Sequence, residues 1–300
     1  MRALEPDVSG YVRSTGAQIY YEAFGSGPAT VLLMPPWQVV YARTWKMQIP
    51  YLARHYRVIV YDPRGNGKSS RPAEADAYTY RAHADDALAV LNACGEGHAT
   101  IVGYSRGGIV LAMLATQHPE RVDGAIFLAP VAPLGPPRHT QNLWDKPLES
   151  DDGWAKHNKH YWLRAYDDWL DFFAHKLFTE SHSTMGIENV NEWGRQTSAE
   201  VLIATYEAPR SNGEPPADHA AALAYYARIR CPVLVIHGSD DAVIAHSTGA
   251  GVAEATGGAL VTIEGGGHSP HARHPVKVNL LIRRFVDGVI AGHPADAHLG

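Results

Sequence analysis

Ser105 is the residue whose surroundings point most directly to chemistry. It stands midway between Gly103 and Gly107, after an apolar run at 100–102 and before a helix-compatible run at 109–117. A serine in such a Gly-x-Ser-x-Gly turn between a strand and a helix is a nucleophile elbow, and the tight turn leaves no room for side chains at the flanking positions. The pattern therefore predicts an exposed serine oxygen able to attack an electrophile. A plain glycine-serine turn is the alternative interpretation.

A serine nucleophile needs a base to take its proton and an acid to orient that base. In a parallel sheet, such groups lie beyond the carboxyl ends of the strands. His268 follows the apolar run 259–263 behind three glycines, which let the loop aim the ring at the serine. Asp241 follows the run 233–236 and is the expected acid; Asp240 is the alternative, and both could be turn formers. The order serine, aspartate, histidine fits this type of sheet.

The developing negative oxygen of an acyl-transfer reaction also needs two backbone N–H donors. The elbow supplies one, the N–H of Arg106. The second is expected in the loop after the strand 31–34, where Pro35 and Pro36 have no N–H to offer. Trp37 is the first residue there with a free N–H and is the predicted second donor, although it could also simply pack against other side chains.

Three histidines invite a metal interpretation, since His268, His271 and His274 are spaced by three residues. That spacing does not gather three imidazoles on one helix face as well as a spacing of four does, and no cysteine or glutamate completes a zinc pattern. We therefore expect neither a metal nor another cofactor.

Apolar runs alternate with helix-compatible segments, which predicts a mainly parallel sheet covered on both faces. The expected strands are 18–22, 29–34, 56–61, 100–102, 124–128, 232–237 and 259–263, and the expected helices include 84–94, 109–117 and 276–288. This alternation of apolar runs and helices is lost between residues 133 and 229, a segment with several prolines near both ends. Within it, residues 154–177 are predicted to be helical. We expect a core formed by residues 1–132 and 230–300, with a helical lid inserted at 133–229.

The expected lid is aromatic and acidic. It holds five of the seven tryptophans, and its nine Lys/Arg against fourteen Asp/Glu give −5, which equals the net charge of the whole chain. The tryptophans line an apolar pocket or form the lid's own core. As pocket residues, the expected substrate contacts are Trp37, Tyr104, Trp144, Trp162 and Trp169. An acidic pocket mouth would favour a cationic substrate, whereas an ordinary solvated face would not.

Five segments together resemble the motifs of one family: 24–28 (Phe-Gly-Ser-Gly-Pro), 61–69 (Tyr-Asp-Pro-Arg-Gly-Asn-Gly-Lys-Ser), 103–108, 238–241 and 266–268. Over nearly its whole length the chain resembles the α/β-hydrolase fold family. The resemblance implies a mostly parallel, eight-stranded sheet with helices on both faces and an inserted helical lid. The chain departs from the family at Pro35 and Pro36, where members usually have His-Gly.

The resemblance also implies a reaction. Family members that carry a serine at the elbow include enzymes that cleave carboxylic esters or lactones through an acyl-enzyme, here on Ser105. An acidic, aromatic lid would suit a bulky cationic macrocyclic lactone, as in the family's macrolide esterases, which would make the protein an antibiotic-resistance enzyme. The alternatives are a C–C bond hydrolase or thioesterase with the same triad, and a small-molecule receptor with slow turnover.

Composition narrows the remaining classes. A net charge of −5 over 300 residues gives no basic surface for nucleic acid, and no apolar run is long enough to span a membrane. With Cys94 and Cys231 as the only cysteines and no apolar N-terminal leader, a cytoplasmic location is expected. We expect a small-molecule partner and a monomer or homodimer.

Overall fold

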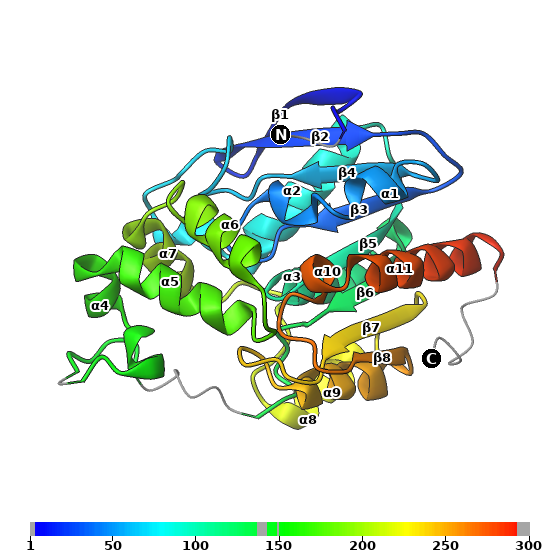
Figure 1. Ribbon diagram of the computed structural model, residues 1–300. Helices are drawn as coiled ribbons and strands as arrows, with labels where there is room; N and C mark the ends of the chain where they lie inside the picture. Colours follow the sequence, from blue (N-terminus) through cyan, green and yellow to red (C-terminus); the bar gives the residue numbers. More distant parts are fainter. Residues whose placement is uncertain (1–3, 137–142, 149, 293–300) are drawn as a thin grey trace.

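An eight-stranded sheet crosses the centre of the molecule (Figure 1). In the computed structural model, which describes residues 4–136, 143–148 and 150–292, the strand order is β1-β2-β4-β3-β5-β6-β7-β8. Strand β2 is antiparallel to β1 and β4, and all later neighbours are parallel. The strands are β1 Val8–Ser14, β2 Ala17–Phe24, β3 Thr30–Met34, β4 Arg57–Tyr61, β5 Ala99–Tyr104, β6 Val122–Leu128, β7 Val233–Gly238 and β8 Ala259–Ile263. The expected sheet is confirmed.

Helices cover both faces of this sheet because successive strand residues point to opposite sides. Ile101 of β5 belongs to the apolar cluster under one layer of helices, whereas the next residue, Val102, belongs to the cluster under the other layer. The first layer contains α2 Tyr80–Ala93, α3 Gly107–Gln117 and α9 His246–Thr256, and the second contains α1 Ile49–Leu52 and α11 Pro275–Ile290. Short helical turns lie at η1 Ala42–Trp45, η2 Ala75–Tyr78, η3 Pro119–Arg121 and α10 Pro270–Arg273.

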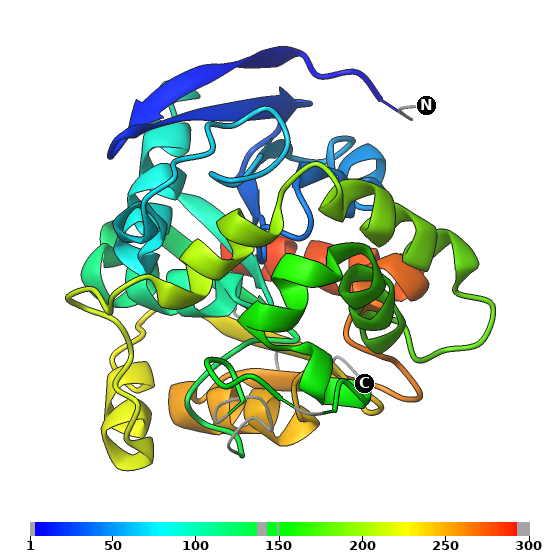
Figure 2. The same cartoon turned by 90° about the vertical axis from the view of Figure 1, so that its left-hand side faces the viewer.

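Further helices lie between β6 and β7, where the sequence predicts an insertion. They are η4 Gly153–Lys156, α4 Lys159–Arg164, α5 Tyr166–Leu177, α6 Thr184–Gly194, α7 Ala199–Glu207 and α8 His219–Tyr226. Helices α4 to α7 gather at one side of the sheet, and Figure 2 looks onto them from that side. Helix α8 differs, because it contacts α3 and α9 and buries Tyr226 in the core cluster. The expected lid segment 133–229 therefore ends in a helix that packs as part of the core.

Two local features differ from the sequence-based expectations. Strand β1 was not anticipated, because it is an edge strand whose residues are mostly exposed and carry little apolar pattern. The helical stretch expected at 154–177 is divided into three pieces. The last break is at Ala165, whose φ of −145° and ψ of 51° are not helical.

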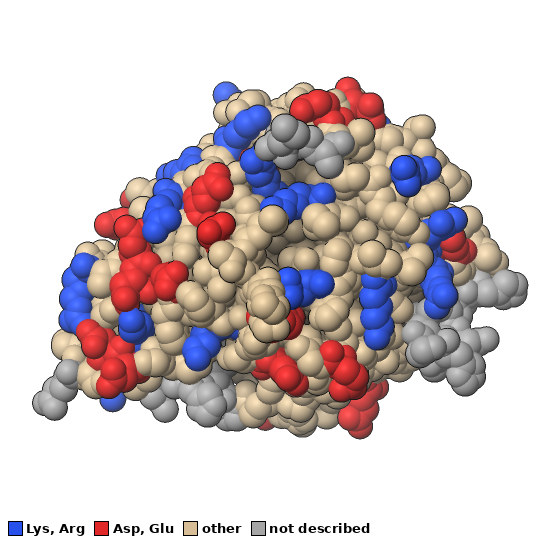
Figure 3. Space-filling model, viewed as in Figure 1, with Lys and Arg blue, Asp and Glu red and all other residues tan. Residues whose placement is uncertain are grey.

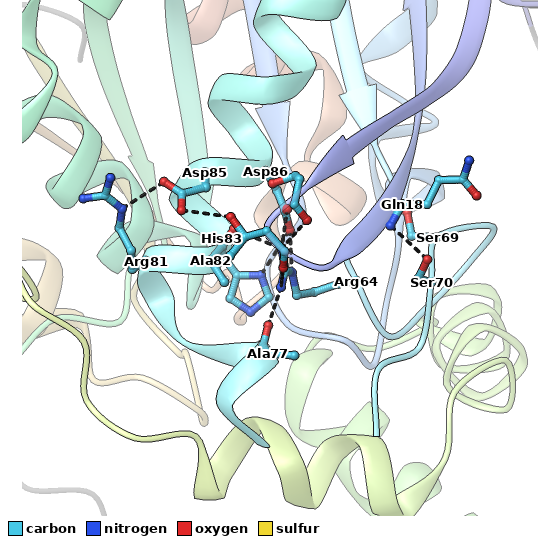
Figure 4. A network of polar contacts seen from close by, with 12 residues as sticks. Gln18, Arg64, Ser69, Ser70, Ala77, Arg81, Ala82, His83, Asp85 and Asp86 are labelled. Atoms are coloured by element: carbon cyan, nitrogen blue, oxygen red, sulfur yellow. Dashed lines mark hydrogen bonds and ion pairs between the residues drawn. The ribbon is translucent and has the colours of Figure 1, made fainter. Parts of the chain in front are cut away.

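A buried ion pair anchors the segment that follows β4. Arg64 donates from Nε and Nη2 to the two carboxylate oxygens of Asp86, at 2.8 and 2.6 Å, and both side chains are fully buried (Figure 4). The guanidinium also donates to the carbonyl of Ala77. Burial raises the pKa of Asp86, although the contact with Arg64 opposes that rise. The pair ties the loop after β4 to α2.

Replacing Asp86 with alanine is expected to lower the free energy of unfolding by about 3–5 kcal/mol, because the Arg64 charge is left buried without its partner. Urea denaturation measures this loss. Asp85 on the same helix is the matched control, since its ion pair with Arg81 is partly exposed and its replacement is expected to cost less than about 1 kcal/mol. Equal losses for the two variants would contradict the prediction.

Candidate active site

Ser105 occupies a strained turn between β5 and α3. Its φ is +52°, a value that residues other than glycine rarely adopt. A Cβ at Gly103 would lie 2.7 Å from the carbonyl oxygen of Gly107, and a Cβ at Gly107 would lie 3.1 Å from that of Pro35. The glycines are thus required by close backbone approach, and the turn exposes Ser105 to the cavity described below.

The hydroxyl, imidazole and carboxylate expected to meet do form a chain. His268 Nε2 lies 3.0 Å from Ser105 Oγ, and His268 Nδ1 lies 2.7 Å from Asp241 Oδ2. The side chains of His268 and Asp241 are almost completely buried. Of the two aspartates that the sequence left open, Asp241 makes this contact, whereas the carboxylate of Asp240 accepts a hydrogen bond from Ser239. This chain can take a proton from the serine and hold the resulting imidazolium.

Asp241 is held by four donors. Its Oδ1 accepts the backbone N–H groups of Val243 and Ile244 at 2.8 and 2.9 Å. Its Oδ2 is shared by His268 and by a second histidine, His237, whose Nε2 lies 3.0 Å away. Burial would raise the pKa of Asp241, but the two histidines lower it well below its usual range. His237 is not predicted from the sequence, where its only signal is a histidine inside an apolar strand.

Arg106 and Trp37 are the residues expected to supply backbone N–H donors to a ligand of Ser105. Arg106 is the residue before the first turn of α3, and Trp37 lies in the loop after β3. Among the described residues, neither N–H donates to another protein group. The side chains of both point elsewhere: Trp37 Nε1 donates to Thr205 Oγ1, and Arg106 donates to the carbonyl oxygen of Thr205. These two N–H groups are therefore available to donate to the oxygen of a ligand.

The fold and this geometry agree with the comparison with known families. A family model described as the alpha/beta hydrolase fold matches residues 40–275. The chain belongs to this family. The non-heme chloroperoxidase of Streptomyces lividans is 29% identical over 285 residues, covering 91% of this chain and 97% of that protein. The alpha/beta hydrolase fold family is thus shown by sequence as well as by topology.

Solved structures of other members superpose over most of the chain. The bromoperoxidase from Bacillus anthracis is 25% identical with a TM-score of 0.75, covering 93% of this chain and 100% of that one. The esterase EaEST from Exiguobacterium antarcticum is 22% identical with a TM-score of 0.77, again covering 93% and 100%. The named reactions of these proteins differ, so the reaction and substrate of this chain have to be argued from the site.

A cavity opens over Ser105 and His268, with about 930 Å³ of empty space including its mouth. The loop after β3, together with α5, α6 and α10, contributes most of its wall, which is largely apolar. Trp37 and Tyr104 line it, as the sequence predicts. Burial raises the pKa of Tyr104, whose hydroxyl shares a hydrogen bond of 2.8 Å with Ser269. A hydrolase of this fold therefore has room here for an apolar ligand beside the serine.

The other tryptophans expected to contact substrate lie outside this wall. Trp162 and Trp169 are fully buried, with ring centroids 4.3 Å apart. Trp144 packs edge-on against Trp162 and stacks on Tyr206. The expectation that these three line the pocket is corrected: the inserted helices are too small to bury their apolar faces without them, so the rings form their own core.

The histidines near His268 serve separate contacts. His271 Nε2 lies 3.0 Å from Thr44 Oγ1, and burial lowers the pKa of His271 to about 3. His274 Nε2 lies 3.9 Å from a carboxylate oxygen of Glu180. Within residues 4–136, 143–148 and 150–292, no group of three or more His, Cys, Asp or Glu could hold a metal ion. In those same ranges, no helix is both long and apolar enough to cross a membrane.

The charged side chains in the described wall of the cavity are Lys46 and Arg273, both cationic. Arg273 donates to the backbone carbonyls of Ser181 and His182, which satisfy hydrogen bonds without cancelling its charge. Burial, followed by the nearby charge of Arg43, lowers the pKa of Lys46. Figure 3 shows the hollow on this face with Lys and Arg side chains beside it, whereas Asp and Glu gather over the outside of the inserted helices.

Proposed function

We propose that the protein is a serine-dependent hydrolase of carboxylic esters or lactones. The observation that carries this proposal is the unbroken chain from Ser105 Oγ through His268 to Asp241, with the hydroxyl facing an apolar cavity. Water and ester can both reach that hydroxyl, and no other group of the described wall offers an activated nucleophile. Residues 133–229, apart from α8, would act as the lid over this site.

In the proposed reaction, Ser105 Oγ attacks the carbonyl carbon while His268 Nε2 takes its proton. Asp241 keeps the other ring nitrogen protonated and stabilises the imidazolium. The N–H groups of Arg106 and Trp37 stabilise the oxyanion, a contribution of about 10²–10³-fold for one donor. The alcohol leaves with the proton from His268, and water then attacks the acyl carbon while His268 takes its proton. The bond from that carbon to Ser105 Oγ breaks, the carboxylic acid is released, and His268 returns the proton to Ser105.

The direct test combines turnover with labelling. We expect hydrolysis of 4-nitrophenyl esters and of simple lactones, and a stoichiometric mass gain on the peptide containing Ser105 after treatment with a fluorophosphonate. Thioesters and vinylogous diketones belong in the same panel, because a thioesterase or C–C bond hydrolase would use the same groups. Tight binding of one compound without turnover would instead indicate a receptor. An enzyme that cleaves none of these esters and is not labelled would refute the proposal.

The charges around the cavity do not favour an amine-bearing macrocyclic lactone as the substrate. The acidic side chains of the inserted segment lie partly in ion pairs on its outer surface, such as Asp167 with Arg195 and Asp151 with Arg164. Among the described residues that line the cavity, by contrast, the charged side chains are the cationic Lys46 and Arg273. The wall therefore supports a neutral, apolar acyl group over a cationic one.

This charge preference is measurable with two 4-nitrophenyl esters of equal shape. We expect kcat/KM for the neutral 5,5-dimethylhexanoate to exceed that for the 4-(trimethylammonio)butanoate by about tenfold or more, because like charges repel in a partly desolvated site. Lys46→Gln is expected to reduce the ratio of kcat/KM between the neutral and the cationic ester. Glu192, which lies close enough to act on Lys46 from outside the wall, stays in place in both measurements. Preference for the cationic ester would contradict the prediction.

A further inference from the structure

His237 is a fully buried histidine that no step of the reaction uses. It stands at the end of β7, and its Nε2 lies 3.0 Å from Asp241 Oδ2 and 3.1 Å from the carbonyl oxygen of Ile244. Asp241 therefore contacts two imidazoles through the same oxygen, one belonging to His268 and one to His237. The second contact needs an explanation because histidine is costly to bury unless its polar atoms are satisfied.

The partners of His237 determine its protonation. Both groups facing Nε2 are acceptors, a carboxylate and a carbonyl, so Nε2 must carry the hydrogen. The other nitrogen, Nδ1, is buried and meets no hydrogen-bond partner among the described residues. A proton there would be an unpaired buried donor, which is unfavourable. His237 is thus held as the neutral tautomer with hydrogen on Nε2.

The imidazole ring of His237 is closely packed by residues of α9. Gly249 of α9 lies against it, and a Cβ on that residue would be 2.4 Å from Nδ1. The ring is also flanked by His246, with centroids 5.5 Å apart, but His246 Nε2 bonds Thr262 and not Asp241. The ring therefore presents its single N–H to Asp241 Oδ2 and to the carbonyl oxygen of Ile244.

We propose that His237 is a positioning residue of this site: its neutral ring is a fixed donor that orients the Asp241 carboxylate toward His268. The inference rests on the proposed function, since it concerns the acid of the same triad. With Val243 and Ile244 holding Oδ1, the donor from His237 prevents rotation of the carboxylate about its last bond. His237 also withdraws negative charge from Oδ2, the oxygen that His268 uses.

Loss of this donor has two separable effects. The carboxylate is less well oriented, so fewer molecules have the imidazole of His268 aligned with Ser105. The oxygen facing His268 also carries more negative charge, which favours the imidazolium and keeps His268 protonated to higher pH. The first effect lowers kcat, and the second moves the acid limb of the kcat/KM profile to higher pH.

Other titratable groups surround the triad and must stay constant in the comparison. They come from the neighbouring strands, helices and loops: Tyr104, Glu180, Asp240, His246, Glu264 and His271. None of them contacts Asp241 Oδ2 within hydrogen-bond distance, so a substitution at His237 changes that oxygen's donors selectively.

The experiment uses 4-nitrophenyl ester hydrolysis from pH 5 to 10 with matched variants. His237→Phe keeps a ring at this position and removes the hydrogen-bond donor. We expect kcat to fall about tenfold with little change in KM. We also expect the acid limb of the kcat/KM–pH profile to move about half a pH unit to higher pH. His237→Gln returns an amide N–H near Nε2 and is expected to restore both. His246→Phe, which alters the adjacent ring, is expected to leave the limb unmoved. Wild-type behaviour of His237→Phe, or a loss of kcat with an unmoved limb, would overturn the proposal.

A measurement on the unmodified protein is independent of turnover and of how well the variants fold. Nitrogen-15 NMR of the histidine side chains is expected to show His237 with hydrogen on Nε2 and a bare Nδ1. An imidazolium, or hydrogen on Nδ1, would overturn the proposal. If the wild type cleaves no ester, the hydrolase assignment fails by itself, while this spectrum still decides whether His237 is the donor to Asp241.

Discussion

Replacing Ser105 with alanine is expected to lower kcat for ester hydrolysis by about 10⁶-fold, since members of such a triad act as a unit. Within the part of the chain that the structure describes, Ser105 Oγ is the oxygen bonded to His268 Nε2, at 3.0 Å, so the substitution leaves the base with no hydroxyl to activate. Residual acceleration would come from the N–H donors and from binding. Steady-state kinetics at high enzyme concentration, together with loss of fluorophosphonate labelling, measures the effect.

Ser269 provides the matched control for that variant. It lines the same cavity and directly follows His268, but its hydroxyl bonds to Tyr104 rather than to the base. Ser269→Ala is therefore expected to keep kcat within about tenfold of the wild type. Both variants should retain the thermal transition of the parent protein. More than a few per cent of wild-type activity in Ser105→Ala would show that another group is the nucleophile.

The elbow could be predicted from sequence because its geometry excludes side chains at particular positions. Gly103 and Gly107 are dictated by backbone atoms 2.7 and 3.1 Å from where a Cβ would be, and such a constraint leaves a fixed spacing in the sequence. Buried parallel strands such as β3 and β5 can be predicted for a similar reason, since both of their faces must be apolar. Strand β1 lies at an edge with mostly exposed residues, so no comparable constraint marks it.

The sequence alone cannot show which of several residues of one type has the functional role; that depends on the folded structure. Asp240 and Asp241 are adjacent residues of the same type, and only the direction of the loop after β7 decides which one faces His268. The tryptophans show the same limit, because a ring in the core of the inserted helices and a ring in a cavity wall have the same hydrophobic pattern. Trp37 lines the cavity whereas Trp162 is enclosed, although both belong to one aromatic cluster.

His237 shows a further limit of sequence reasoning. Its strand is apolar on both faces, and a histidine there is ordinarily taken as a tolerated core residue. Its partner is four residues later in the chain, beyond the strand, at a position whose approach depends on the turn at 239–244. The pairing of His237 with Asp241 is therefore a property of the folded loop and could not be derived from spacing.

Replacing Asp241 with asparagine is expected to lower kcat by about 10⁴-fold while leaving the fold intact, because the amide imposes the wrong tautomer on the base. If the amide oxygen keeps the N–H groups of Val243 and Ile244, the NH₂ group faces His268 Nδ1. That nitrogen must then accept, so the hydrogen moves to Nε2, the atom that should take the proton of Ser105. Steady-state kinetics and the proton resonance of the His268 ring measure the change.

Asp241→Asn also tests the contact between Asp241 and His237, in addition to the loss of activity. The same NH₂ group would also face His237 Nε2–H, so two donors would oppose each other in a buried site. Adding His237→Phe removes that conflict, and the double variant is expected to lose less activity than the product of the two single losses. Asp240→Asn, one residue away on the exposed side of the loop, is the control and is expected to stay within about threefold of wild type. Independent, multiplicative losses at 237 and 241 would mean that the two side chains do not act through a shared oxygen.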